Sequence, residues 1–375
     1  MSHPIVAIIA NDDIWTYNLR KEIIEEMLSQ GFRVALIVKN GPRIKDLEKI
    51  GCEFVEVAFN RHGVNPIYDI KLLLDYWKVL EKLKPCIVLT FTIKPNVYGG
   101  LACQMLKIPY IPNVTGLGSA IEKHSILQPL ALTLYRLGLH RAKKVFFQNS
   151  ENMNFFIRKK LVKNNFDLLP GSGVNLIYYS PTIYPPEDNI NFVFIGRIMK
   201  EKGIDQYLEA AQYIKKKYHN THFHICGFCE ENYADKLQIL SSQGIIIYHG
   251  MVNDMREMLK NIHCTIHPTY YPEGLSNVLL ESCACGRPII TTNRSGCREV
   301  AEDGVNGYIV REKDGKDLID KIEMFLALSN EDRKIMGLAG RAKVEREFNR
   351  QVVVDAYMGE LDAITYGEQK IFVGI

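Results

Sequence analysis

Short apolar runs alternate with longer amphipathic segments through the first half of the chain. Short continuous apolar runs are typical of strands that are buried on both faces of a parallel sheet. The strands expected in this half are 5–9, 34–38, 54–57, 87–91, 110–114 and 145–147. Apolar residues at helical spacing predict helices between them, near 17–30, 66–83, 96–107 and 127–141. This alternation predicts a parallel sheet with helices on both faces.

The alternation weakens near residue 171, where prolines and glycines cluster and apolar periodicity is lost, so 171–190 is expected to be a linker. A second alternating series follows. Its expected strands are 192–195, 222–226, 245–248, 265–267, 289–291 and 308–310. Its expected helices lie near 203–217, 232–242, 253–262, 275–285, 314–327 and 331–347. The sequence therefore predicts an α/β protein with two doubly wound, Rossmann-like domains.

The predicted domains are 1–170 and 191–348, and the segment 349–375 is expected to form a helix that packs back on the first domain. Ligands of open α/β sheets bind outside the carboxyl ends of the strands. Two such domains facing each other would leave a cleft there, and chemistry is best sought at the strand ends.

Charge and composition narrow the function classes. Residues 1–175 carry 23 basic and 15 acidic residues, a balance of +8, whereas the net charge of the whole chain is only +3. The nine cysteines are scattered, which fits reduced thiols in a cytoplasmic protein. The sequence starts without a signal peptide and its apolar runs fall short of the ~20 residues of a membrane span. We expect a cytoplasmic protein, and nothing points to a nucleic-acid partner.

The strongest chemical signal lies between Pro268 and Gly286. A strand is expected to end at residue 267, and a turn leads into a helix that is expected near Leu275. The free N–H groups at this helix start would form an anion site, and they belong to Gly274, Leu275 and Ser276. Glu273 and Glu281 lie eight residues apart, on one side of a helix, where carboxylates can accept the vicinal hydroxyls of a sugar. Alternatively, Glu273 complements the helix dipole and Glu281 is solvated.

A second signal follows the strand that begins the second series. Gly196 and Arg197 end this strand, and Lys202 and Gly203 open the next helix. The guanidinium fork, the ammonium group and the helix N-terminus together suit a diphosphate. Ordinary basic residues in a surface loop are the alternative.

Together the two signals resemble the retaining glycosyltransferases of family 4, which have the GT-B fold. The Gly-Arg…Lys-Gly and Glu-x7-Glu motifs of that family match Gly196, Arg197, Lys202, Gly203, Glu273 and Glu281. The resemblance implies that a sugar, for example a hexose, an N-acetylhexosamine or a uronic acid, is transferred from a UDP-sugar with retention of configuration. It also implies that no metal or other cofactor takes part. Glu273, Arg197 and Lys202 would then be catalytic, and the residues from Gly274 to Ser276 would complete the donor site.

Residues 92–99 and 115–119 resemble the capsule and cell-surface polysaccharide (CapM-like) branch of this family. This implies a lipid-diphosphate-linked saccharide as acceptor, bound by the domain 1–170. The residues expected on the acceptor side are Asn11, Asp12, Thr115, Gly116, Leu117 and Gly118. The chain departs from the family where Ile93 or Lys94 stands near the position of a histidine. Lys94 would assist the leaving group or be a plain surface lysine.

Two rival functions and one location remain open. A UDP-sugar 2-epimerase or hydrolase shares the fold, and a non-catalytic subunit could bind nucleotide-sugar without transfer.

The segment 126–139 places Leu127, Leu130, Leu134 and Leu137 at helical spacing, and basic residues follow it. Such a helix suits a peripheral contact with an anionic membrane, although an apolar stripe is more often part of a core.

Overall fold

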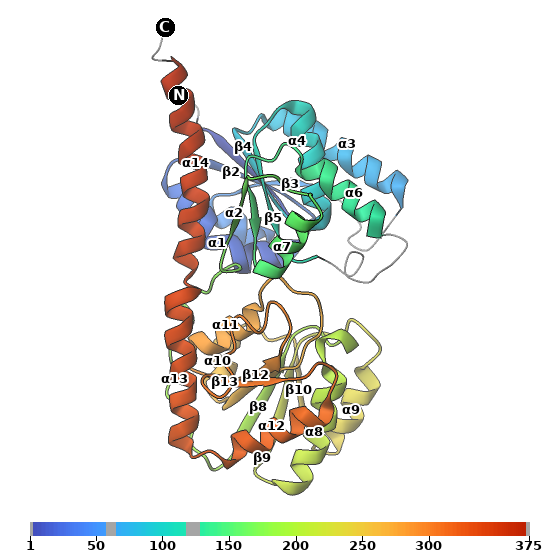
Figure 1. The fold of residues 1–375 in the computed structure, drawn as a ribbon, viewed down its shortest axis with the longest axis vertical. Coiled ribbons are helices and arrows are strands. Elements are labelled where there is room, and N and C mark those ends of the chain that lie inside the picture. The colour runs from blue at the N-terminus through green and yellow to red at the C-terminus, as the bar shows by residue number, and fades with distance from the viewer. Residues whose placement is uncertain (1–2, 58–64, 118–127, 373–375) are drawn as a thin grey trace. The chain divides into compact units, whose positions relative to one another are not determined.

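The computed structural model describes residues 3–57, 65–117 and 128–372. The chain divides into two compact units (Figure 1). The first unit comprises Met1–Ser172 and Gln351–Ile375, and the second comprises Gly173–Arg350. Residues 173–190, which belong to the expected linker, are thus part of the second unit. There the Val174 N–H donates to the Phe348 carbonyl at 2.8 Å.

The first unit contains a parallel sheet in the order β3-β2-β1-β4-β5-β6-β7. Its strands are β1 (Ile5–Ile9), β2 (Arg33–Val38), β3 (Glu53–Glu56), β4 (Ile87–Phe91), β5 (Tyr110–Val114), β6 (Val145–Phe147) and β7 (Phe166–Leu168). Its helices are α1 (Asp13–Ser29), α2 (Ile44–Ile50), α3 (Pro66–Leu83), η1 (Pro95–Gly99), α4 (Gly100–Leu106), α6 (Gln128–Leu139), α7 (Ser150–Arg158) and α14 (Arg350–Phe372). The sequence prediction missed β7, α2 and α7, which are short, and it placed the start of α1 four residues too late.

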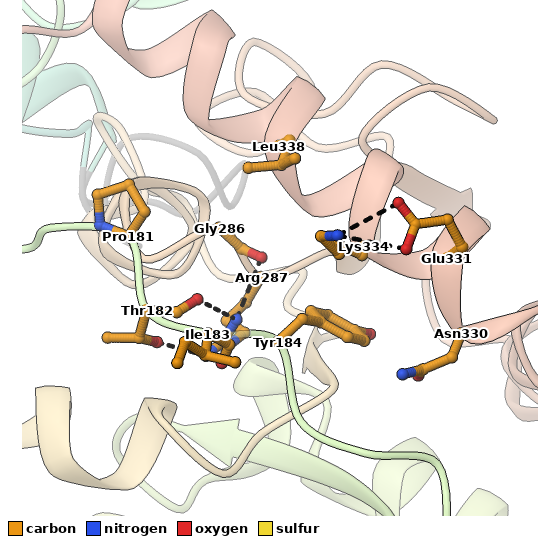
Figure 2. A pocket seen from close by; sticks show the side chains of 10 residues that line it. All are labelled: Pro181, Thr182, Ile183, Tyr184, Gly286, Arg287, Asn330, Glu331, Lys334 and Leu338. Atoms are coloured by element: carbon orange, nitrogen blue, oxygen red, sulfur yellow. Dashed lines mark hydrogen bonds and ion pairs between the residues drawn. The ribbon is translucent and has the colours of Figure 1, made fainter.

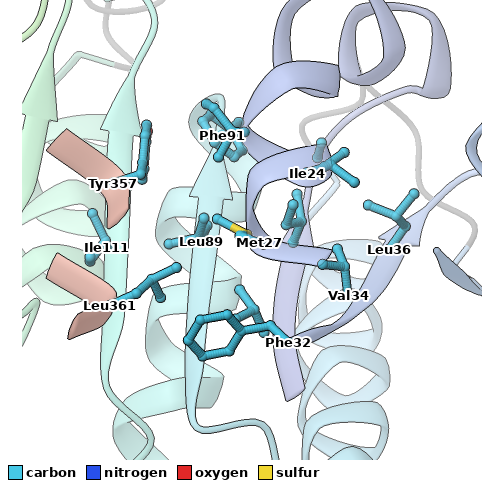
Figure 3. Packing of buried hydrophobic residues seen from close by; sticks show 14 of the residues in the cluster. Ile24, Met27, Phe32, Val34, Leu36, Leu89, Phe91, Ile111, Tyr357 and Leu361 are labelled. Atoms are coloured by element: carbon cyan, nitrogen blue, oxygen red, sulfur yellow. The ribbon is translucent and has the colours of Figure 1, made fainter. Parts of the chain in front are cut away.

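Alternate residues of each strand face the two sides of this sheet, and each side has its own core. Residues of α1, α2 and α14 pack on one face, and residues of α3, α4, α6 and α7 pack on the other. Figure 3 shows the first of these cores, where Tyr357 and Leu361 of α14 lie beside Leu89, Phe91 and Ile111 of the sheet. The C-terminal helix therefore supplies part of the core of the first unit.

The second unit repeats this plan with a parallel sheet in the order β10-β9-β8-β11-β12-β13. Its strands are β8 (Ile190–Ile195), β9 (Thr221–Cys226), β10 (Ile247–Gly250), β11 (Cys264–His267), β12 (Ile289–Thr292) and β13 (Gly307–Val310). Its helices are η2 (Lys200–Lys202), α8 (Ile204–Lys217), α9 (Ala234–Ser242), α10 (Met255–Leu259), α11 (Asn277–Ala284), α12 (Gly315–Ala327) and α13 (Asn330–Glu347).

Residues of α8, α9 and α12 pack on one face of the second sheet, and residues of α10, α11 and α13 pack on the other. All six strands and six helices expected here are present, with ends that move by a few residues, and the helix expected near 253–262 is reduced to the five residues of α10. Among the described residues of both units, no helix combines the length and the apolar character needed to cross a bilayer.

Candidate active site

The motifs of the second unit follow β8 and β11, which are neighbours in the sheet. The chain proceeds from β8 toward β9 and β10 on one side, and from β11 toward β12 and β13 on the other. The order of strands thus reverses between β8 and β11. In open α/β sheets, loops separate at this point and leave room for a ligand at the carboxyl ends.

Arg197 directly follows β8 and is held from two sides. Its Nη1 lies 2.5 Å from Oε2 of Glu230, and its guanidinium carbon lies 4.9 Å from the centre of the Tyr271 ring. The Arg197 side chain keeps only 14% of its exposure. A guanidinium has five donors, so the contact with Glu230 leaves several for an anionic ligand.

Lys202 and Gly203 bring the amino end of α8 to the same place. Gly203 has φ +78°, and a Cβ at this position would collide with the Pro268 carbonyl, so only glycine fits. Gly203 is also the N-cap of α8, which receives no side-chain capping bond. The Nζ of Lys202 lies 5.1 Å from the centre of the Tyr271 ring, so one ring contacts both cations of the motif.

Glu273 forms an ion pair with Lys202, and Nε2 of the buried His267 lies 3.5 Å from its Oε1. Burial by itself would raise the pKa of the Glu273 carboxyl. The Lys202 charge and the contacts with His267 outweigh burial and hold this pKa well below its usual range. Glu273 is therefore a carboxylate near neutral pH, which can accept hydrogen bonds but cannot act as an acid.

The helix that follows Glu273 begins later than the sequence suggested. Its first residue is Asn277, and the Ser276 N–H donates to the Gly296 carbonyl at 2.8 Å, so this N–H group is not free. The helix start predicted near Leu275 is two residues too early, and the prediction of a free N–H at Ser276 was wrong, because this group bonds to the loop that contains Gly296. Gly296 has φ +89°, and an added Cβ would lie 3.3 Å from Cβ of Glu273.

Two polar groups at the start of α11 lack a hydrogen-bond partner within the described part of the chain. They are Oγ of Ser276 and Oδ1 of Asn277, and both are buried. No side chain caps this helix either. Buried polar atoms normally have partners, so the end of α11 beside Glu273 is suited to receive a polar ligand.

Glu281 lies in α11 and contacts a different set of residues. Burial raises the pKa of its carboxyl to about 7, although the charge of Arg350 and a hydrogen bond with Tyr179 lower it. The Glu-x7-Glu spacing does not arise from one helix face, because Glu273 precedes α11. Glu281 is thus partly buried and partnered rather than a solvated helix residue.

The structure brings Arg197, Lys202 and Glu273 together around Tyr271. Sequence reasoning missed Tyr271 and Glu230, although both follow a strand end, which was the available signal. It also missed Tyr179 and Arg350 beside Glu281. These two residues lie about 100 and 70 positions away along the chain, so no local pattern could have linked them to Glu281.

Residues predicted for the acceptor side also follow strand ends, in the first unit. Asn11 follows β1, and the Oδ1 of Asp12 accepts the Trp15 N–H at 2.8 Å and so caps α1. Thr115, Gly116 and Leu117 follow β5, whereas Gly118 lies outside the described residues.

Lys94 is not a plain surface lysine. Its Nζ lies 2.8 Å from Oδ1 of Asp69, and the Lys94 side chain keeps 15% of its exposure.

The apolar stripe of α6 is divided between solvent and core. Leu130 and Leu137 keep 57% and 51% of their exposure, whereas Leu134 packs against the core. Residues 126 and 127 lie outside the described part. Two of the lysines that follow, Lys143 and Lys144, form ion pairs with Glu360 of α14, so they contribute less positive charge than the sequence indicated.

A separate cavity of about 480 Å³ opens in the second unit, beside the segment that precedes β12 (Figure 2). It is lined by residues of the segment 181–184, by Gly286 and Arg287 before β12, and by the start of α13. The buried Arg287 donates to the carbonyls of Leu259 at 2.8 Å and Ile183 at 3.0 Å, which ties the segment to the unit. None of the predicted site residues lines this cavity, so it is separate from the cluster around Tyr271.

Comparison with known families agrees with the position of these motifs. The model of the glycosyl transferases group 1 matches residues 181–343, and the model described as glycosyl transferase 4-like matches residues 5–149. Together the two matches cover most of both units.

Relatives by sequence carry the names of surface-polysaccharide enzymes. The N,N'-diacetylbacillosaminyl-diphospho-undecaprenol alpha-1,3-N-acetylgalactosaminyltransferase of Campylobacter jejuni is 27% identical, over 93% of this chain and 96% of that protein. The capsular polysaccharide biosynthesis glycosyltransferase CapM of Staphylococcus aureus is 27% identical, over 88% of this chain and 90% of that protein.

Solved structures share the fold. HepE from Anabaena in complex with UDP and glucose superposes with a TM-score of 0.78 at 14% identity, over 96% of this chain and 99% of that one. Because family models match both units and the relatives extend over nearly the whole chain, the chain belongs to glycosyltransferase family 4 with the GT-B fold, and it is a glycosyltransferase.

Proposed function

We propose that this enzyme transfers a sugar from a UDP-sugar to a lipid-diphosphate-linked saccharide, with retention of anomeric configuration and without a metal ion. The observation that carries the proposal is the cluster of Arg197, Lys202 and Glu273 around Tyr271 at the point where the strand order of the second sheet reverses. This cluster joins two cations and one ionised carboxylate, which suits a diphosphate attached to a sugar.

Arg197 and Lys202 are the groups that hold the diphosphate in this proposal. Charge-assisted hydrogen bonds to phosphate are strong, and the N-terminus of α8 beside them adds free N–H groups and the helix dipole. These groups stabilise the negative charge that develops on the diphosphate as it leaves. In other enzymes a divalent metal ion stabilises the leaving diphosphate. Here the basic groups supply that positive charge, and we therefore propose that no metal takes part.

Glu273 binds hydroxyl groups of the donor sugar. Its carboxylate remains ionised near neutral pH, since Lys202 holds its pKa low, and so it accepts hydrogen bonds from the sugar. Glu281 binds the ribose hydroxyls of the nucleotide. The unpartnered Ser276 and Asn277 lie at the start of the same helix and supply further polar contacts.

The transfer then proceeds on one face of the sugar. The bond between the anomeric carbon and the β-phosphate oxygen breaks, and the electron pair leaves with UDP. The acceptor hydroxyl forms the new bond on the same face, and its proton passes to the departing phosphate oxygen. Arg197 and Lys202 compensate the charge of UDP throughout, and no protein nucleophile is needed.

The acceptor class follows from the relatives. The Campylobacter jejuni relative is named for a diphospho-undecaprenol acceptor, and a relative of Escherichia coli is named a UDP-Gal:alpha-D-GlcNAc-diphosphoundecaprenol alpha-1,3-galactosyltransferase. That relative is 23% identical over 87% of both chains. Its name supports UDP as the nucleotide, whereas the sugar itself depends on pocket walls that differ between such enzymes.

Because this acceptor is a membrane lipid, we also propose that the first unit contacts the cytoplasmic face of the membrane. The exposed Leu130 and Leu137 lie on one side of α6. Exposed basic residues lie at the end of α7 and just after it, and they are Arg158, Lys159, Lys160 and Lys163. Each basic residue near an anionic leaflet contributes ~1 kcal/mol, so several give a reversible, salt-sensitive attachment.

Binding of UDP to single variants tests the donor assignment. Arg197→Ala and Lys202→Ala should each weaken UDP by roughly 10–100-fold, since a charge-assisted bond is worth ~1.5–3 kcal/mol. Glu281→Gln should weaken both UDP and UDP-sugar, whereas Glu273→Gln should spare UDP and impair transfer. Lys216→Met, an exposed lysine of α8, is the matched control. Wild-type affinity in both cation variants would refute the assignment, and a product with inverted configuration would refute retention.

A further inference from the structure

The first sheet has its own point of reversal, between β1 and β4. The register pairs Ile9 with Thr90, and its continuation places Asn11 beside Thr92 just beyond the carboxyl ends of the two strands. This is the place that Arg197 and the loop of Glu273 occupy in the second sheet. A ligand site is therefore expected here as well.

Thr92 is strained and its hydroxyl is unused. Its φ is +75°, in a region that a β-branched residue avoids. Its Oγ1 is buried and has no hydrogen-bond partner among the residues that the structure describes, and the same holds for Oδ1 of Asn11. Strained backbone persists where its surroundings enforce it, and such residues gather at ligand sites. The strained turn at Thr92 thus brings one hydroxyl, and the segment after β1 brings one amide, to the carboxyl ends of the two strands.

Lys94 follows two residues later at the start of η1, a π-helix of five residues, Pro95–Gly99. Asp69, in the first turn of α3, accepts from Nζ of Lys94 at 2.8 Å and from the Tyr98 hydroxyl at 2.9 Å. Both side chains of the ion pair are mostly buried, with 15% and 16% exposure. Because Tyr98 also donates to Asp69, this carboxylate keeps a partner when Lys94 binds elsewhere.

A buried network holds the turn in place from below. The Thr90 hydroxyl donates to Oδ1 of Asn96 at 2.7 Å, and Nδ2 of Asn96 donates to the Asn113 carbonyl at 2.8 Å. Short π-helical turns are often found at functional sites, and residues locked in this way keep a site preorganised. A second cation lies close, since the Arg20 guanidinium stacks 4.3 Å from the centre of the Phe91 ring, next to Thr92.

We propose that Thr92 and Lys94 form the subsite for the diphosphate of the lipid-linked acceptor. The Thr92 hydroxyl donates to one phosphate oxygen, and the Lys94 ammonium turns from Asp69 to the diphosphate, whose charge exceeds that of one carboxylate. Asp69 is thus the internal anion that occupies Lys94 in the free enzyme. The inference rests on the proposed function, and it gives Lys94 an acceptor role in place of a role at the leaving group.

Farnesyl diphosphate is a soluble probe for this subsite, and its binding can be measured by calorimetry with and without saturating UDP. Lys94→Met should weaken it by roughly tenfold or more, as expected for a charge-assisted contact. Asp69→Asn should leave the affinity unchanged or raise it, because the competing anion is gone. If the Lys94–Asp69 ion pair were merely structural, both substitutions would lower the affinity for farnesyl diphosphate. Opposite changes in affinity therefore point to direct binding by Lys94. Thr92→Val should weaken binding several-fold, whereas Thr92→Ser should not.

Lys82→Met, an exposed lysine at the far end of α3, is the control for general charge effects. Farnesol should not bind, and Lys94→Met should bind phosphatidylglycerol vesicles as the wild type does. Equal losses in Lys94→Met and Asp69→Asn, or a loss of vesicle binding in Lys94→Met, would overturn the subsite. If Lys94→Met also weakened UDP binding, Lys94 would belong to the donor site, and its assignment to the acceptor subsite would be wrong. If the wild type binds farnesyl diphosphate but not UDP, the donor assignment fails and the subsite stands.

Discussion

Replacing Lys202 with methionine should destabilise the second unit in a way that depends strongly on pH. In the wild type, Lys202 keeps the folded-state pKa of Glu273 far below its ordinary value of 4.5. A depressed pKa adds stability above the unfolded pKa, and this stability is lost only as the pH falls through the folded value. The wild type therefore has the full contribution of Glu273 at pH 7 and most of it at pH 5.

Lys202→Met leaves the Glu273 carboxylate buried without its cation, since the two side chains keep only 12% and 13% of their exposure. Breaking a buried pair costs about 3–5 kcal/mol. In the variant, Glu273 can take up a proton and so avoid a buried charge, and the free energy of this protonation sets an upper limit to the charge-dependent part of the loss. From the ordinary pKa of 4.5, taking up a proton costs ~3.4 kcal/mol at pH 7 and ~0.7 kcal/mol at pH 5. The difference between variant and wild type should thus shrink by about 2–3 kcal/mol between pH 7 and pH 5.

Urea unfolding followed by far-UV circular dichroism at both pH values measures this difference. Both tryptophans of the chain, Trp15 and Trp77, lie in the first unit, so their fluorescence reports whether that unit is affected. Lys216→Met removes an exposed lysine from the same unit and should change the unfolding free energy by less than about 0.5 kcal/mol. A loss of equal size at pH 5 and pH 7 would show that Glu273 is not the group that Lys202 keeps ionised.

Three further outcomes follow from the same structure. Gly203→Ala should destabilise the second unit by at least ~1–3 kcal/mol in urea unfolding, because the residue has φ +78° and its Cβ would meet the Pro268 carbonyl; unchanged stability would show that this turn is not fixed. Burial raises the pKa of Glu281 to about 7, so the wild type loses stability as the pH rises through that value. Glu281→Gln should therefore gain about 1–3 kcal/mol relative to the wild type between pH 5 and pH 8, and a constant difference would contradict the buried carboxyl. Leu130→Ser with Leu137→Ser should reduce flotation with anionic liposomes, whereas Ile239→Ser, exposed in the second unit, should not; equal flotation of both would remove α6 from the membrane contact.

The sheets were predictable because their strands are continuous apolar runs, a signal that depends on nothing outside the run. Short or half-exposed elements gave no such signal. The strand β7 has three residues and is not fully buried, and α2 has seven residues, which is too short for a clear helical period. The start of α11 was misplaced because the Gly296 loop, twenty residues later, sets it through a backbone hydrogen bond.

The same division applies to the site. The proximity of Arg197, Lys202 and Glu273 could be predicted from the sequence because each lies in a motif at a strand end. The pKa values of Glu273 and Glu281 could not be predicted, since they depend on burial and on partners such as His267 and Arg350. The strain at Thr92 left no trace in the sequence either, because threonine is an ordinary residue for a strand end and its positive φ is a property of the turn.

The discontinuous makeup of the first unit has a consequence for its synthesis. Residues of α14, from Val353 to Leu361, complete the core against β4 and β5, yet they follow residue 172 by about 190 positions. At ~5–20 residues per second, the ribosome needs on the order of 10–40 s to cover that interval. During this time one apolar face of the first sheet remains partly uncovered. The second unit has its whole chain once residue 350 is made, before the core residues of α14 follow. The later-encoded unit can therefore finish folding first, and a chain that stops after residue 350 would carry a permanent apolar surface that chaperones recognise.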